Sequence, residues 1–366
     1  MPDSQRIVIC GAGVVGAAVA HALTARGARP TIVERARPGA AASGRAGGFL
    51  ALDWNDGTPM GPLARAGFQL HRELAATLGR DIGHRPVETL MVAALDAGSV
   101  ESYRALPSPD WLDGNVAVHS VIGTTATTAQ VDPQRLTDAL VDAALERGAT
   151  LVTGVVDGLT PSGGGGGASW NVSVDGHPMP ADVVVLALGP WTARAAAWVP
   201  LPAVHALKGA SITLAADVPA QAVFSEHIGR DGRRSAPEIY PRPGGVVYVN
   251  GSPEDAPLPD DPDVIAPSAR ACDELHRVAG THSSALRDAQ VLTRRACYRP
   301  VTADGVPIIG PVPGAPGVFV ATGHGPWGIL NAPPTGRMVA EMILDGASRS
   351  LDAEPFLPSR LPAAVA

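Results

Sequence analysis

The sequence predicts an α/β fold whose first element is a βαβ unit. A short β-branched run at 6–10 leads into a glycine-rich segment at 11–16, and an apolar helical pattern follows and ends at Gly27. A second short apolar run at 31–33 ends on the acidic residue Glu34. Strand, glycine turn, helix and strand in this order are typical of the Rossmann-like start of a parallel sheet.

Composition narrows the possible classes of protein. At about 150 residues per domain, the 366 residues predict two domains or one large two-part unit. Hydrophobic residues make up 45% of the chain and charged residues 17%, which excludes intrinsic disorder. The net charge of −7 and the lack of long basic runs argue against a nucleic-acid partner. With three cysteines, no secretory leader and no apolar run long enough to cross a bilayer, we expect a cytoplasmic protein without a membrane partner.

The later elements follow from hydrophobic period and from turn residues. Asp132 and Pro133 are a typical N-cap and first residue of a helix that runs to Arg147. The other expected elements are helices at 62–79 and 332–345 and strands at 89–94, 116–122, 150–160, 169–175, 182–188 and 318–322. The five glycines at 163–167 predict a loop tip, and the proline-rich segment 253–267 predicts a surface excursion.

The glycine-rich segment has the GxGxxG spacing of a dinucleotide site. Gly11 makes the tight turn, Gly13 lets the backbone approach a pyrophosphate, and Gly16 lets helix and strand pack closely. The N-terminus of the helix, with Val14 and Val15 in its first turn, then offers free N–H groups and a partial positive charge to phosphates.

Glu34 lies 18 residues after the last glycine of this motif, at the end of the second strand. A carboxylate there can accept hydrogen bonds from both ribose hydroxyls and would repel a 2′-phosphate. FAD or NAD therefore fits better than NADP, and the motif by itself does not separate FAD from NAD.

Three further segments separate the two cofactors. They are 42–49, which reads Ala-Ser-Gly-Arg-Ala-Gly-Gly-Phe, then 182–191, which ends in Gly-Pro-Trp, and finally 298–330, which begins Tyr-Arg-Pro and contains Gly-His-Gly-Pro-Trp-Gly-Ile-Leu. Together with the glycine motif these segments closely resemble the FAD-dependent D-amino-acid oxidase superfamily, which includes glycine oxidase and sarcosine oxidase. The resemblance covers nearly the whole chain, in order.

The resemblance implies a Rossmann-like FAD-binding domain and a discontinuous α+β substrate domain built on a mixed sheet. The FAD-binding domain would comprise 1–56, 125–200 and 294–366, and the substrate domain 57–124 and 201–293. FAD is then the cofactor, a small-molecule amine or amino acid the substrate, and molecular oxygen the second reactant. We expect no metal ion, and either a monomer or a homo-oligomer is compatible with the sequence.

The FAD contacts implied by the resemblance come from these same segments. Ser43 can donate to the pyrophosphate, whereas Gly47 and Gly48 let backbone N–H groups approach a flat ring system that a Cβ would hinder. The turn at 323–328 would direct a helix N-terminus at the flavin. The full set of expected FAD-binding residues is Gly11, Gly13, Val14, Val15, Gly16, Glu34, Arg35, Ser43, Arg45, Ala46, Gly47, Gly48, Val155, Gly189, Trp191, Gly323, His324, Gly325, Trp327, Gly328 and Ile329.

The family reaction transfers a hydride from the carbon that bears an amine to flavin N5, which leaves an imine and, with oxygen, hydrogen peroxide. The expected catalytic residues are Arg299, Tyr240, His324 and Trp327. Arg299 matches the position where glycine-oxidase-like relatives hold the substrate carboxylate; a structural ion pair is the alternative. Trp327 stands where those relatives carry a second Arg, which weakens the case for a carboxylate substrate.

The other candidate residues each have a structural alternative. Tyr240 would cap the pocket or pack in the core, and His324 would contact the flavin or the amine or be a structural residue. Arg45 would polarise the flavin or form a salt bridge to the substrate domain. Arg242 is expected to be solvated, and Lys208, the only lysine, is expected to be structural.

Cys297 matches the place where sarcosine-oxidase-like relatives bind flavin covalently. Buried inert thiols are common, and glycine-oxidase-like members bind FAD non-covalently. We therefore expect that FAD is not attached to Cys297.

Three functions remain open from the sequence. The first is an FAD-dependent oxidase that acts on an amino acid or a secondary amine. The second is an FAD-dependent amine dehydrogenase that uses an electron acceptor other than oxygen. The third is a non-catalytic FAD-binding protein.

Overall fold

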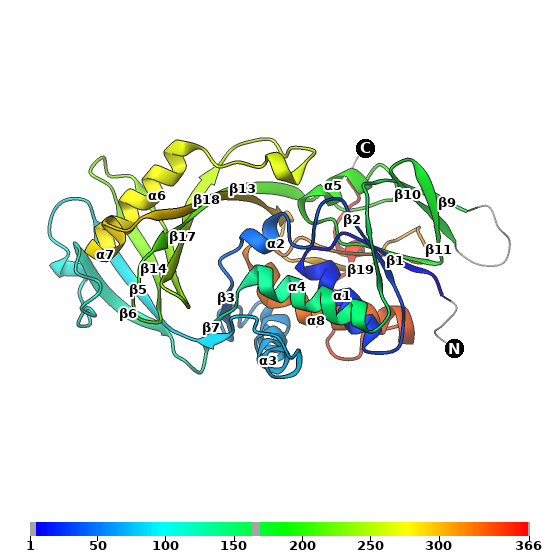
Figure 1. Ribbon diagram of the computed structural model, residues 1–366, viewed down its shortest axis with the longest axis horizontal. Coiled ribbons are helices and arrows are strands. Elements are labelled where there is room, and N and C mark those ends of the chain that lie inside the picture. Colours follow the sequence, from blue (N-terminus) through cyan, green and yellow to red (C-terminus); the bar gives the residue numbers. More distant parts are fainter. Residues whose placement is uncertain (1–4, 163–168, 365–366) are drawn as a thin grey trace.

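The computed structural model describes residues 5–162 and 169–364, which form two sheet-based regions side by side (Figure 1). We call them the parallel-sheet region and the mixed-sheet region. No helix in the described ranges is long and apolar enough to cross a membrane. The expected glycine loop at 163–167 lies outside the described residues.

The parallel-sheet region is built on six strands in the order β19-β20-β12-β1-β2-β8, with only β19 antiparallel to its neighbour. Their bounds are β1 Ile7–Cys10, β2 Thr31–Glu34, β8 Thr150–Thr153, β12 Val183–Leu186, β19 Ile308–Pro311 and β20 Val318–Thr322. The side chains of Ile7 and Ile9 pack in one apolar cluster, and those of Val8 and Cys10 pack in another. This alternation shows that both faces of the sheet are buried.

Helices cover one face of the parallel sheet and a small meander covers the other (Figure 1). The helices are α1 Val14–Thr24, α3 Gly61–Thr77, α4 Pro133–Glu146 and α8 Gly328–Asp345, and the meander strands are β9 Val156–Pro161, β10 Trp170–Val174 and β11 His177–Ala181. Asp132 caps α4 as predicted, since its carboxylate accepts from the N–H groups of Gln134 and Arg135. The strand expected at 150–160 is two strands, because the chain leaves the parallel sheet after Thr153 and enters the meander at Val156.

The mixed-sheet region has the strand order β18-β13-β17-β16-β14-β5-β6, with β15 paired to β14. The bounds are β5 Glu88–Leu95, β6 Val116–Gly123, β13 His205–Ala215, β14 Gln221–Ile228, β15 Arg234–Ser235, β16 Glu238–Arg242, β17 Val246–Glu254 and β18 Val291–Val301. β14 and β5 run parallel and the other pairs antiparallel, which confirms the predicted mixed sheet. Helix α6, Ala269–His282, packs on one face through Cys272, Leu275 and Ala279.

Short elements complete the chain. A three-stranded sheet consists of β3 Phe49–Ala51, β7 Thr128–Gln130 and β4 Arg85–Pro86, and the short helices are α2 Ala42–Arg45, α5 Thr192–Ala195 and α7 Ser284–Arg287. Helix α3 lies within the segment 57–124 that was expected in the substrate domain but contacts the parallel-sheet region, and β18 spans the boundary expected at 294. Helix α3 packs on α8, with Gly67 so close that a Cβ would lie 2.2 Å from the Leu330 carbonyl oxygen. Strand β18 forms the edge of the mixed sheet from Val291 onward. The domain division therefore stays a proposal.

The last helix begins at Gly328 and not near residue 332, although Pro333 and Pro334 lie inside it. A proline removes the N–H that would bond the carbonyl four residues earlier. Here the carbonyl of Ile329, which Pro333 leaves without its helical partner, lies 2.9 Å from Nε2 of the buried His71 on α3. Burial lowers the pKa of His71 to about 4, so the neutral ring donates this hydrogen bond.

The proline-rich segment 253–267 lies mainly at the surface, as expected, but it is held there by specific contacts. Side chains from three elements donate to its backbone carbonyls: Trp191 to Pro259 at 2.8 Å, Tyr298 to Pro257 at 2.6 Å and Arg45 to Pro262 at 3.2 Å. Proline-rich backbone has few N–H groups of its own to satisfy these carbonyls. The segment is therefore tied to the edge of the cavity described next.

Candidate functional site

One elongated cavity runs between the two regions. Its glycine end is lined by the β1–α1 turn and by Glu34, Val155, Trp191 and Pro262. Its aromatic end is lined by rings and charged side chains from the mixed sheet and by the turn before α8. The two ends share the lining residues Gly13, Ala42, Ser43, Ala187, Gly189 and Pro190, so they are continuous.

Backbone geometry shapes the glycine end. Gly11 has φ +105°, and a Cβ on it would lie 2.5 Å from the carbonyl oxygen of Ala187. A Cβ on Gly16 would lie 2.0 Å from the carbonyl oxygen of Gly11, which confirms that this glycine allows α1 to pack on the turn. Helix α1 begins after Gly13 without a side-chain cap on that residue. The hydroxyl of Ser43 takes the N–H of Val14 in the first turn, whereas Val15 of the same turn lines the cavity, where its N–H can bind an anion.

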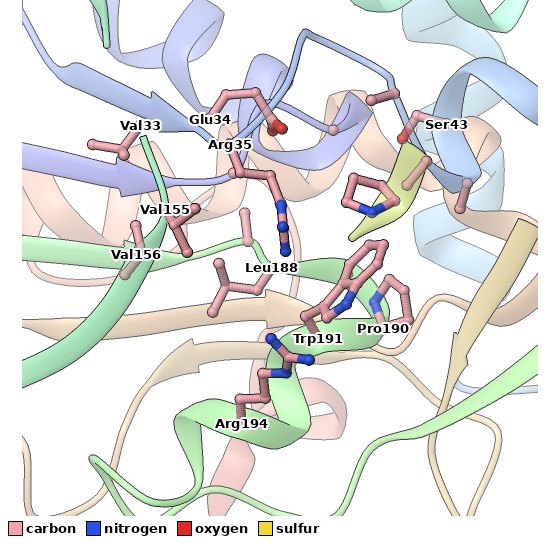
Figure 2. A pocket seen from close by; sticks show the side chains of 18 of the residues that line it. Val33, Glu34, Arg35, Ser43, Val155, Val156, Leu188, Pro190, Trp191 and Arg194 are labelled. Carbon is pink, nitrogen blue, oxygen red and sulfur yellow. The ribbon is translucent and has the colours of Figure 1, made fainter. Parts of the chain in front are cut away.

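Glu34 and Ser43 lie on one side of the glycine end, and Trp191 and Arg194 on the opposite side (Figure 2). The Glu34 carboxylate accepts from the backbone N–H groups of Ala12 at 2.8 Å and Ala36 at 3.0 Å, which fixes it at the carboxyl end of β2. Ser43 accepts from the N–H of Val14 at 2.9 Å. Both side chains are thus held in place at the wall of the cavity, and their contacts with ribose and pyrophosphate stay predictions.

Aromatic rings form most of the wall at the other end. Phe49 stacks on Tyr240 with ring centroids 5.4 Å apart, and Trp54 contacts Phe224 edge-on at 4.8 Å. Trp54 also meets Trp327 edge-on at 6.2 Å. These residues come from β3 and the turn after it, from β14 and β16, and from the turn before α8, so the wall exists only when both regions are in place.

Two oppositely charged side chains line this aromatic end, Arg299 from β18 and Glu238 from β16. Oε2 of Glu238 accepts from the Tyr240 hydroxyl at 2.5 Å and from Nδ2 of Asn250 at 2.8 Å. Burial, together with the charge of Glu238, raises the pKa of Tyr240 well above its usual value, so the phenol keeps its proton and donates. Arg299 has no ion-pair partner among the described residues.

His324 and Cys297 also line the aromatic end, and both are buried. Nε2 of His324 is 3.0 Å from the Thr335 hydroxyl, and burial lowers the pKa of the ring to about 4, so the imidazole is neutral near pH 7. Burial likewise raises the pKa of the Cys297 thiol, which disfavours the reactive thiolate.

Several expected site residues lie outside the lining. Gly16 and Gly323 support the turns from behind, and Arg45 donates to the carbonyls of Ile265, Ala296 and Pro262. Arg45 therefore joins α2 to the proline-rich segment without the salt bridge that was one of its two expected roles. Gly47 and Gly48, both expected to let backbone approach a flat ring, do line the cavity, and a Cβ on Gly47 would lie 2.5 Å from a ring carbon of Tyr240.

Arg242 is not solvated, contrary to the expectation. It is half-buried, donates to the carbonyls of Ala46 at 2.9 Å and Gly47 at 3.0 Å, and stacks over Tyr248 with its guanidinium carbon 4.8 Å from the ring centre. The three groups that Arg242 contacts all belong to residues that line the cavity, so its side chain points toward the cavity and not into solvent. Lys208 pairs with Glu254 at 2.5 Å, as expected of a structural lysine.

Sequence reasoning missed several lining residues from strands, short helices and loops. At the aromatic end they include Trp54, Phe224, Glu238, Tyr248 and Asn250, and at the glycine end Arg194, Trp198 and Pro262. The alternation of side chains along β16 could have predicted Glu238 as a lining residue. Glu238 is two residues before Tyr240, an expected catalytic residue, and therefore lies on the same face of the strand.

Comparisons with known proteins agree with this geometry. A family model described as FAD dependent oxidoreductase (DAO) matches residues 6–342. The chain is 30% identical to an oxidoreductase of Schizosaccharomyces pombe whose name gives no substrate, over 98% of this chain and 99% of that protein. It is 28% identical to glycine oxidase of Geobacillus kaustophilus over 98% of each. The crystal structure of glycine oxidase from Geobacillus kaustophilus superposes with a TM-score of 0.79 at 27% identity, covering 98% of this chain and 99% of that one.

Proposed function

The chain belongs to the DAO family of FAD-dependent oxidoreductases, and on that premise we propose that it is an oxidase of an amino acid or a secondary amine. The substrate would be oxidised at the carbon bearing the amine, to an imine that water hydrolyses, and molecular oxygen would be reduced to hydrogen peroxide. The observation that carries the proposal is the single cavity with a dinucleotide-type turn at one end and a charged, aromatic-walled chamber at the other.

The residues present fit FAD. The two ends of the cavity share lining residues, the turn at Gly11 has no room for a side chain, and the first turn of α1 lines the cavity through Val14 and Val15. Glu34 stands at the position of a ribose acceptor at the end of β2. When bound, FAD supplies the chemistry, by accepting a hydride from the substrate carbon.

The chain's own residues would bind and orient the substrate at the aromatic end. Arg299 presents a planar guanidinium without an ion-pair partner in the described chain, which suits a carboxylate. The rings of Phe49, Trp54 and Trp327 exclude water and offer flat apolar surface to a side chain or an N-substituent. His324 is neutral and hydrogen-bonded to Thr335, so we assign it a supporting role beside the cofactor.

A panel of amino acids, N-methyl amino acids and amines, assayed with air as the only electron acceptor, tests the proposal. The expected result is stoichiometric hydrogen peroxide and imine-derived carbonyl product from at least one amino acid. Reduction of the flavin by a substrate under nitrogen, without peroxide release in air, would establish a dehydrogenase instead. If no compound reduces the flavin while dithionite does, the chain is a non-catalytic FAD-binding protein.

A further inference from the structure

The carboxylate of Glu238 lines the aromatic end of the cavity and has no role in the proposed function. In the register of the mixed sheet, Glu238 is directly opposite Asn250 on β17 and Phe224 on β14. Strand residues two apart share a face, so Glu238 lies on the face of Tyr240, away from α6. It is half-buried and is the carboxylate among the described lining residues of the aromatic end.

Only one oxygen of this carboxylate is used within the protein. Oε2 takes both hydrogen bonds, from Tyr240 and Asn250, and these fix the orientation of the group. Oε1 receives no hydrogen bond from a described residue and is not among the buried atoms that lack a partner. An atom without a partner that is not buried is open to solvent, and for a side chain that lines the cavity the open space is the cavity itself.

The surroundings of Oε1 suit a cation. A carboxylate held beside aromatic faces binds an ammonium through a charge-assisted hydrogen bond and through cation–π attraction. Arg299, on the same cavity wall, forms no ion pair with Glu238 or with any other carboxylate in the described ranges. The negative charge of Glu238 and the positive charge of Arg299 can therefore both pair with a ligand. A ligand with one ammonium and one carboxylate would neutralise the two side chains together.

We propose that Glu238 binds the ammonium group of the substrate and accepts its proton, an inference that rests on the proposed function. A protonated amine has no lone pair to assist loss of a hydride from the adjacent carbon. In the proposed step one N–H bond breaks, its electron pair stays on nitrogen, and the proton moves to Oε1 of Glu238. The products are a neutral amine and a neutral carboxylic acid, and no electron is exchanged in this step.

Other titratable or charged groups around Glu238 do not compete for this role. Tyr240 on the same strand and Tyr248 on β17 keep their protons, because burial raises the pKa of Tyr248 to about 12 and that of Tyr240 well above its usual value. His324 is neutral and bonded to Thr335. From β18, Arg299 is cationic and the pKa of the Cys297 thiol is raised by burial.

Three branched probes that share a quaternary carbon separate an ammonium site from a structural carboxylate. They are tert-butylammonium, pivalate and 2-aminoisobutyrate, none of which has a hydrogen on the carbon that would be oxidised. Their affinities for the FAD-loaded protein are measured by calorimetry and by perturbation of the flavin spectrum. In Glu238→Gln, which preserves an acceptor for Tyr240 and Asn250, affinity for tert-butylammonium and 2-aminoisobutyrate should fall roughly 10- to 100-fold while pivalate binding is retained. Glu238→Asp should restore part of the loss.

The matched control is Glu226→Gln, which removes the same charge from an exposed residue of β14 that pairs with Arg234. This variant should bind all three probes like the wild type. Equal weakening of pivalate and tert-butylammonium in Glu238→Gln would overturn the inference, because it would show that the residue only supports the fold of the pocket.

The pH dependence of kcat/KM gives a second readout with an oxidisable amine. Without a proton acceptor, Glu238→Gln should use only the neutral fraction of the amine, so its kcat/KM should rise about tenfold per pH unit up to the pKa of the amine, more steeply than that of the wild type. An unchanged profile together with unchanged ammonium affinity would overturn the inference and leave the proposed function standing. Glu238-dependent ammonium binding without oxidation of any amine would instead overturn the proposed function alone.

Discussion

The two ends of the cavity are built in different ways. The glycine end is formed mainly by backbone, at a turn where Gly11 and Gly16 leave no room for a Cβ, with Glu34 pinned by two backbone N–H groups. The aromatic end is formed by side chains from β3, β14, β16, β17 and β18, which are far apart in the sequence. A backbone-built site tolerates little change in the chain, whereas a side-chain-built site can change its ligand through single substitutions.

The largest expected effect is at the glycine end, in Gly16→Ala. The added Cβ would lie 2.0 Å from the carbonyl oxygen of Gly11, so the backbone of the turn must move. We expect a colourless protein that binds no FAD at concentrations that saturate the wild type, measured by absorbance after gel filtration. The control is Gly209→Ala, where a Cβ would have no neighbour within 4 Å and which should remain yellow. A yellow Gly16→Ala protein that binds FAD with wild-type affinity would show that the turn can accommodate a Cβ at this position.

Arg299→Ala should act on the aromatic end alone. We expect kcat/KM for an amino acid to fall by roughly 30- to several-thousand-fold, because a charge-assisted carboxylate contact is lost in a water-poor pocket, while the Kd of FAD is unchanged. Arg299→Lys should recover only part of the activity, since an ammonium lacks the planar fork. Arg294→Ala on the same strand, which removes an exposed pair with Asp273, is the matched control. If the loss in Arg299→Ala is equal for the amino acid and its decarboxylated amine, Arg299 does not bind a carboxylate.

Both regions should lose stability together in acid. His71 in the parallel-sheet region and His282 in the mixed-sheet region are fully buried, and burial lowers the pKa of each to about 4. The folded pKa is below the unfolded value of 6.5, so their contribution is complete above pH 6.5 and is lost as the pH falls toward 4. We expect about 2–3 kcal/mol per histidine between pH 7.5 and 4.5, measured by denaturant unfolding. His71→Asn and His282→Asn should each flatten this dependence, and a stability that is flat in the wild type over this range would contradict the assignment.

Glu34→Ala should weaken FAD binding by roughly 1–3 kcal/mol, because a hydrogen-bonded charged acceptor is lost at the end of β2. In contrast to Arg299→Ala, the preference for an amino acid over its amine should persist in the FAD-saturated variant. Titration of FAD into apoprotein gives the affinity, and peroxide assays at saturating FAD give the preference. A changed preference would mean that the two ends are coupled.

The smallest expected effect is in Cys297→Ser. The thiol is buried with a raised pKa, so we expect non-covalent FAD. Acid precipitation should release the flavin into the supernatant from wild type and variant alike. Flavin fluorescence that stays with the denatured wild-type chain and is lost in Cys297→Ser would show covalent attachment.

The contrast between the two ends also explains which parts of the site could be predicted from the sequence. The β1–α1 turn and Glu34 belong to one βαβ unit, and the spacing of 18 residues between Gly16 and Glu34 is enough to predict their geometry. Glu238 and Asn250 are 12 residues apart and meet only through the register of β16 and β17, which no local pattern determines. The inward turn of Arg242 and the packing of segment 253–267 on Trp191 likewise depend on tertiary contacts. Local patterns therefore predicted the fold class and a dinucleotide site, the family resemblance predicted FAD, and neither predicted the composition of the aromatic end.

Anaerobic mixing of the FAD-loaded protein with matched substrate pairs tests the central claim most directly. The pairs are each enantiomer of phenylalanine against phenethylamine, and sarcosine against dimethylamine, followed by the loss of flavin absorbance. An amino-acid oxidase should be bleached by at least one amino acid at least about thirtyfold faster than by its amine, and air should restore the colour with one hydrogen peroxide per flavin. A faster reaction of the amine in each reactive pair, or a flavin that dithionite bleaches and none of these compounds does, would contradict amino-acid oxidation.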